Sequence, residues 1–130
     1  MNNYKPEDYI SYRIEKAKET IEEVQNHIEN GFWNTAINRM YYACFYAVGA
    51  LLIKHHIEVV SHSGARQKFG EYFVKSGIIS REFAKHYTDL FQKRQKGDYD
   101  DFFDYDSETV LRLFPRSKEF ITLIEQLLKD

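Results

Sequence analysis

Cysteine is almost absent from this chain, because Cys44 is the only one among 130 residues. A single thiol cannot form an intramolecular disulfide, and a chain of this length buries enough apolar surface to need no cross-link. We therefore expect a reducing, cytoplasmic compartment. Residues 1–8 are polar and do not predict a secretory signal, and we expect no segment long enough to span a membrane.

Glycine and proline are scarce, and neither sign of charge dominates. The 18 basic and 20 acidic side chains give a net charge of -2, which argues against the broad positive field of proteins that bind duplex DNA without sequence preference. Aromatic side chains are abundant instead, with 10 tyrosines and 10 phenylalanines. Tyrosine suits half-buried positions, protein interfaces and base-stacking surfaces.

Apolar residues recur at helical spacing nearly throughout, and no segment alternates as a strand would. We expect helices over about residues 6–30, 32–56 and 63–75, a fourth between Ser80 and Gly97, and a last one that begins near Ser107. Pro115 should kink or break the last helix. Short connections predict an all-α, up-down bundle of four to five helices that forms a single domain over residues 1–130.

The second expected helix is apolar on all sides. One face belongs in the bundle core and carries Ile37, Tyr41, Cys44, Val48, Leu51 and His55. The opposite face carries Arg39, Tyr42, Ala43, Tyr46, Ala50 and Ile53. A helix without a polar face is buried on both sides, and in so small a domain we expect another chain to cover one of them. The pattern therefore predicts a homodimer, or an obligate partner, in contact with this helix.

Arg39 lies on that opposite face, and a buried guanidinium is costly unless an acceptor lies within reach. One interpretation is a structural ion pair with Asp98 or Asp101. The other is contact with a phosphate or an RNA in a cleft between two protomers. The acidic residues of the segment 98–106 also suit the cap of the last helix and pairing with Arg94. They lack the glycine and the terminal glutamate of a calcium loop, and we expect no metal site.

Basic residues gather on the fourth expected helix, where they alternate with aromatic ones. They are Arg81, Lys85, His86, Lys93, Arg94 and Lys96. Such a mixture is compatible with binding of single-stranded RNA, but it is also what an ordinary solvated helix face contains. Both interpretations stay open at this point.

The run from Ala36 to Ala47, AINRMYYACFYA, resembles the signature helix of the small prokaryotic HEPN (higher eukaryotes and prokaryotes nucleotide-binding) proteins. In those proteins a polar residue and an arginine precede a Tyr-Tyr-Ala core. Residues 94–99, RQKGDY, resemble the Arg-x-x-x-Asp-Tyr element that follows their fourth helix. His62 stands where many relatives carry a histidine. The resemblance covers nearly the whole chain.

This resemblance implies a homodimeric helical bundle with the signature helices near its axis. Many relatives are encoded beside a minimal nucleotidyltransferase as a toxin-antitoxin pair. Active members are endoribonucleases that need neither a metal nor a cofactor and use an Arg-x(4–6)-His motif. In this chain Asn38 and Arg39 match the start of that motif. RNA or phosphate contacts would come from Arg39, Tyr42, Arg94, Asp98 and Tyr99.

Tyr46 stands where the motif requires its histidine, with six residues between it and Arg39. Imidazole titrates near neutral pH, whereas a phenol with a pKa of about 10 is a poor general base. His62 is the best substitute, although a histidine at a helix start often serves only in capping or packing. Three hypotheses follow: an RNA-binding or toxin-like module, a metal-independent ribonuclease with a degenerate Arg-x6-Tyr motif, and a purely structural dimer.

Overall fold

The computed structural model describes residues 3–130, and these residues form five α-helices and one π-helical turn. Their bounds are α1 Pro6–Glu29, α2 Trp33–Lys54, α3 His62–Phe69, η1 Gly70–Val74, α4 Arg81–Tyr99 and α5 Ser107–Lys129. No strand occurs within residues 3–130. The protein is therefore an all-α bundle, as the apolar spacing predicts.

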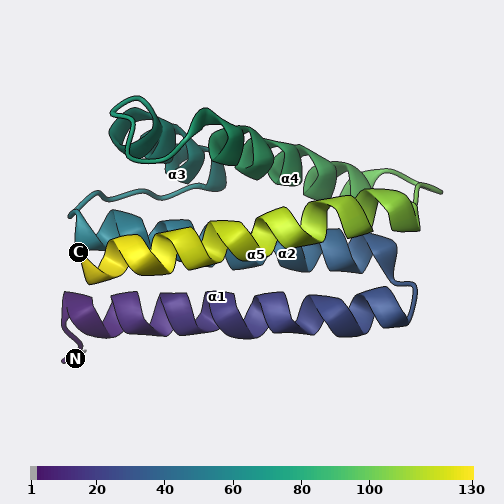
Figure 1. Ribbon diagram of the computed structural model, residues 1–130, viewed down its shortest axis with the longest axis horizontal. Helices are drawn as coiled ribbons and strands as arrows, with labels where there is room; N and C mark the ends of the chain where they lie inside the picture. Colours follow the sequence, from purple (N-terminus) through teal and green to yellow (C-terminus); the bar gives the residue numbers. More distant parts are fainter. Residues whose placement is uncertain (1–2) are drawn as a thin grey trace.

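Consecutive long helices run in opposite directions (Figure 1). The α1 helix lies on one side of the pair α2 and α5, and α3 and α4 lie on the other side. A tight turn joins α1 to α2, and Gly31 adopts a left-handed conformation there with φ of 70°. Only glycine takes that conformation without strain, which is why α1 and α2 can fold back on each other within a few residues.

The α2 helix occupies the centre of the bundle and packs against α1, α3, α4 and α5. Four alanines of α2, Ala36, Ala43, Ala47 and Ala50, are completely buried. Small side chains on several faces let neighbouring helices approach closely. The chain itself therefore covers much of the helix face that the sequence pattern assigns to a second subunit.

Two expectations about α2 are wrong. His55 is exposed, with its ring edge-on to Phe73 at 5.0 Å, because α2 ends at Lys54 and the chain turns away at His56. The second is the expectation that no segment is long enough to span a membrane. The 22 residues of α2 are long and apolar enough to do so by length and composition alone. Most of that segment is buried inside the bundle, which is the property of a core helix.

The other helices differ from expectation mainly at their ends. Ser61 caps α3 by accepting a hydrogen bond from the Gly64 N–H at 2.9 Å, and the following turn widens into η1. The α4 helix continues to Tyr99, past the expected end before Gly97. Asp106 caps α5 by accepting a bond from the Thr109 N–H at 2.9 Å.

The α5 helix is not broken at Pro115. Proline removes the hydrogen bond that its N–H would donate to the carbonyl of Leu111. Both residues lie on the exposed side of the helix, so water can satisfy that carbonyl. The exposed position of Pro115 explains why the predicted break does not occur, whereas the predicted kink stays a prediction.

Candidate functional site

An aromatic cluster surrounds Tyr41 at the point where α2 meets α3 and α4. Tyr41 is completely buried, and its ring lies 5.1 to 6.0 Å from five neighbouring rings. These are the rings of Tyr42, Phe45, His62, Tyr87 and Phe91. Of the predicted site residues, Tyr42 and His62 belong to this cluster and Arg94 contacts it.

Arg94 inserts from α4 into this cluster and is only 7% exposed. Its Cζ lies 4.9 Å from the centroid of the Tyr41 ring and 5.7 Å from that of Tyr42. A guanidinium over aromatic faces gains cation–π attraction that replaces part of its lost hydration. Its Nη1 lies 3.9 Å from Asp98, whereas its Nε has no hydrogen-bond partner among residues 3–130. Arg94 therefore faces rings and Asp98 rather than solvent.

Asp98 joins α4 to α2. Its two carboxylate oxygens accept hydrogen bonds from the Asn38 side-chain amide at 3.3 and 3.1 Å, and it pairs with Arg94. The predicted pairing of the acidic segment with Arg94 is confirmed. Asn38 and Asp98 together fix the position of α4 on the signature helix. Tyr99, the next residue, is 74% exposed at the end of α4.

Arg39 pairs with α1 rather than with the acidic segment. Its Nε lies 3.5 Å from Glu23 Oε2, without the geometry of a hydrogen bond, and its Cζ lies 5.8 Å from the Tyr42 ring. The expected ion pair with Asp98 or Asp101 is therefore wrong. The reason is helix register, since α1 runs alongside α2 and brings Glu23 to Arg39. The Arg39 side chain remains 27% exposed, so a ligand can reach it.

His62 folds back onto α2 from the start of α3. Its Nδ1 lies 2.7 Å from the Tyr41 hydroxyl, and its ring stacks on Phe45 with centroids 4.3 Å apart. Burial and the nearby Arg94 guanidinium lower the pKa of His62 below its usual 6.5. Burial raises the pKa of Tyr41 to about 12. Both groups are therefore neutral at pH 7. The second ring nitrogen of His62, Nε2, takes no part in the hydrogen bond with Tyr41.

Tyr46 and Arg39 flank the same ring, as their helical spacing predicts. The Tyr42 and Tyr46 ring centroids are 6.2 Å apart, and Arg39 lies against the other side of Tyr42. Tyr42 and Tyr46 are both half-buried. These three side chains form a continuous strip along α2, which we call the α2 strip.

A pocket that the sequence did not predict lies beside this strip, where α1 meets Tyr46. It has a volume of about 690 Å³ and is lined by Tyr4, Asp8, Tyr9, Tyr12, Arg13, Lys16 and Tyr46. Tyr9, Tyr12, Arg13 and Lys16 recur at spacings of three, one and three, which places them on one side of a helix. That repeat was the available signal. No group of three or more residues able to hold a metal ion occurs in the described part of the chain.

The sequence matches the HEPN domain family over residues 10–127. The chain belongs to the HEPN family. It is 33% identical to a "UPF0332 protein" of Thermotoga maritima over 95% of this chain and 94% of that protein. It is 30% identical to "Putative toxin MJ0142" of Methanocaldococcus jannaschii, over 88% of this chain and 78% of that protein. "Putative toxin MJ0605" of the same organism is 29% identical over 93% and 90%.

Proposed function

We propose that this HEPN protein is a cytoplasmic, toxin-like module that binds single-stranded RNA at the α2 strip. The observation that carries this proposal is the environment of Arg39. Its guanidinium is partly exposed, and its buried Nε lacks a hydrogen-bond partner among residues 3–130. The ion pair with Glu23 is long, and the Glu23 side chain is 53% exposed. A phosphate can therefore compete with Glu23 for Arg39.

The rings beside Arg39 supply the second half of an RNA site. Tyr42 and Tyr46 are half-buried, which holds their rings in place while leaving part of each accessible. Bases of single-stranded RNA stack on such rings, and arginine contacts the phosphates between them. The names of the two relatives from Methanocaldococcus jannaschii support a toxin-like role. Arg94 would act indirectly, because its guanidinium contacts the Tyr41 and Tyr42 rings from inside the bundle and holds them in position.

The proposed assembly is a homodimer that meets along the outer face of α2. Phe45 and Ile53 are apolar residues on this helix that the chain only half covers. Pairing two such faces would bury them and bring two α2 strips toward one cleft. A minimal nucleotidyltransferase is the partner that the family resemblance suggests, and it would antagonise RNA binding by the dimer.

Binding rather than cleavage is favoured by the residues around Arg39. Tyr46 stands at the motif position of histidine, and a phenol is in general a poorer base than an imidazole. His62 stacks on Phe45, and its Nδ1 is hydrogen-bonded with the Tyr41 hydroxyl, so these contacts give it a packing role. Its free Nε2 keeps a ribonuclease as the second candidate function. In that reaction Arg39 would stabilise the phosphate and His62 would transfer the proton.

Fluorescence anisotropy with a labelled 12-nucleotide RNA, in buffer with EDTA, tests the proposal. We expect Arg39→Ala to weaken binding about tenfold, the loss of one charge-assisted phosphate contact. Lys85→Ala removes an exposed positive charge from α4 and should change affinity little. Equal affinities for wild type and Arg39→Ala would contradict the proposal. If wild type cleaves the RNA and His62→Ala does not, the protein is a ribonuclease and the binding-only proposal is wrong.

A further inference from the structure

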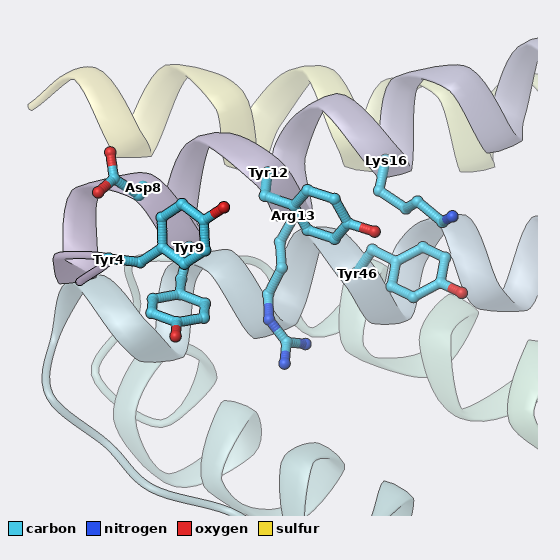
Figure 2. A pocket seen from close by; sticks show the side chains of 7 residues that line it. All are labelled: Tyr4, Asp8, Tyr9, Tyr12, Arg13, Lys16 and Tyr46. Carbon is cyan, nitrogen blue, oxygen red and sulfur yellow. The ribbon is translucent and has the colours of Figure 1, made fainter. Parts of the chain in front are cut away.

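The pocket beside α1 has the composition of a ligand site. Its volume of about 690 Å³ lies within the usual range for small-ligand pockets. Four of the seven residues that line it are tyrosines, three from the N-terminal part of the described chain and Tyr46 from α2. In Figure 2 the Arg13 side chain extends between the rings of Tyr9 and Tyr46, and Lys16 lies beside Tyr46.

The two cations of the pocket have no acidic partner in the described chain. Neither Arg13 nor Lys16 makes an ion pair or a side-chain hydrogen bond within residues 3–130, whereas Lys18 on the same helix pairs with Glu125 at 2.9 Å. Asp8 is the one carboxylate that lines the pocket. It accepts a bond from the Lys5 N–H at 2.8 Å, and Figure 2 shows it pointing away from Arg13 and Lys16. The cationic end of the pocket is therefore suited to an anion.

Gly49 of α2 makes room for Arg13. A Cβ atom at this position would lie 2.7 Å from Arg13 Nη1 and 3.3 Å from its Cδ. Any other residue at position 49 would push the guanidinium aside. Because the displaced group is the end of a flexible side chain, the fold would tolerate the change, and alanine is a better helix former than glycine.

The pocket is continuous with the α2 strip, because Tyr46 belongs to both. Its ring lines the pocket and lies 6.2 Å from the Tyr42 ring, which in turn contacts Arg39. An RNA strand that follows the rings from Arg39 past Tyr42 therefore arrives at the α1 tyrosines. A strand needs alternating contacts for bases and phosphates, and tyrosines next to Arg13 and Lys16 supply them.

We infer that this pocket binds one unpaired nucleotide, with the base on the tyrosine rings and the phosphate on Arg13 and Lys16. The inference rests on the proposed RNA binding at the α2 strip and extends it by a second subsite. A nucleotide is favoured over a second copy of the chain. A two-fold contact centred on Arg13 and Lys16 would bring them toward their own counterparts, where like charges repel.

Three substitutions test the pocket by anisotropy with the labelled 12-nucleotide RNA. Tyr12→Ala removes an exposed ring and should weaken binding at least about fivefold, whereas Tyr12→Phe keeps the ring and the affinity. Lys16→Ala should weaken binding and lower the slope of log K against log salt by about 0.7, as expected for one lost phosphate contact on a single strand. Gly49→Ala displaces Arg13 and should weaken binding while thermal stability is kept or raised.

The matched controls are Tyr72→Ala, which removes an exposed ring from η1, and Lys85→Ala, which removes an exposed charge from α4. Both should bind like wild type. Wild-type affinity in Tyr12→Ala, Lys16→Ala and Gly49→Ala, with weakened Arg39→Ala, would overturn the pocket and leave the α2 strip. Weakening in the pocket variants with Arg39→Ala unchanged would support the pocket and refute the role of Arg39. A change in sedimentation of Tyr12→Ala alone would identify the pocket as a subunit contact and overturn the inference.

Discussion

Individual buried polar groups show how burial decides charge in this protein. His86 is 8% exposed, and its Nε2 lies 2.9 Å from Ser117 Oγ, which itself donates to the Leu113 carbonyl at 3.0 Å. The Ser117 oxygen thus accepts from the His86 Nε2–H, a bond that both the neutral and the charged imidazole can make. Burial, aided by the Arg116 charge, lowers the pKa of His86 to about 4.

This pKa predicts that the fold loses stability in mild acid, at pH values above those at which carboxylates titrate. Below pH 6.5 the unfolded chain takes up a proton on His86 that the native state refuses until about pH 4. The free energy of unfolding should therefore decrease as the pH is lowered, by about 1.5 kcal/mol from pH 6.5 to pH 5. Urea denaturation at both values measures it. In His86→Gln, which cannot titrate at this position, the loss should shrink to the part that His62 contributes through its own lowered pKa. A loss equal to that of wild type would contradict the assignment.

The same scale shows what the sequence could not predict. Arg39 was correctly placed on the outer side of its helix beside Tyr42, because helical spacing alone determines this. Its partner Glu23 was missed, because the pairing depends on the register of α1 against α2, a tertiary property. The sequence indicated His62 only as the best substitute for the motif histidine, and its bond to Tyr41 required the structure.

Among the elements, α2 carries most of the functional argument. Its bounds agree with expectation to within two residues, because Gly31 and the change of pattern after Lys54 are local signals. Its apolar circumference was interpreted as evidence for a second subunit. The structure shows that α1, α4 and α5 already cover much of it. What is left for a partner is a half-buried outer face that includes Phe45 and Ile53.

That outer face predicts the oligomeric state. We expect wild type to sediment at twice the chain mass of 15.6 kDa. Ile53→Glu should shift the protein toward the monomer, because the dimer would desolvate an unpaired carboxylate. Leu111→Glu, at an exposed position of α5, is the matched control and should stay dimeric. A wild-type monomer at tens of micromolar would rule out the α2 dimer.

For the whole molecule, the question is which surface faces RNA. Two basic and aromatic surfaces of the described chain are the candidates that the sequence raises or the pocket adds: the α2 strip with its α1 pocket, and the outer side of α4. The sequence could not choose between them, because both combine arginine or lysine with aromatic rings. The structure separates them, since Arg94 of α4 is buried in the aromatic cluster and Lys93 and Lys96 pair with Asp89 and Asp100. Arg13 and Lys16 make no ion pair within residues 3–130, and the pair of Arg39 with Glu23 is long, at 3.5 Å. Lys85 of α4 is exposed as well, which is why its substitution serves as the control.

Photo-crosslinking of a 12-nucleotide RNA that contains 4-thiouridine, followed by mass spectrometry, tests this choice directly. We expect crosslinks at Tyr42 and Tyr46 of α2 and at Tyr12 of α1, all reduced in Arg39→Ala. Crosslinks confined to residues 81–96 of α4, with none on α1 or α2, would contradict it.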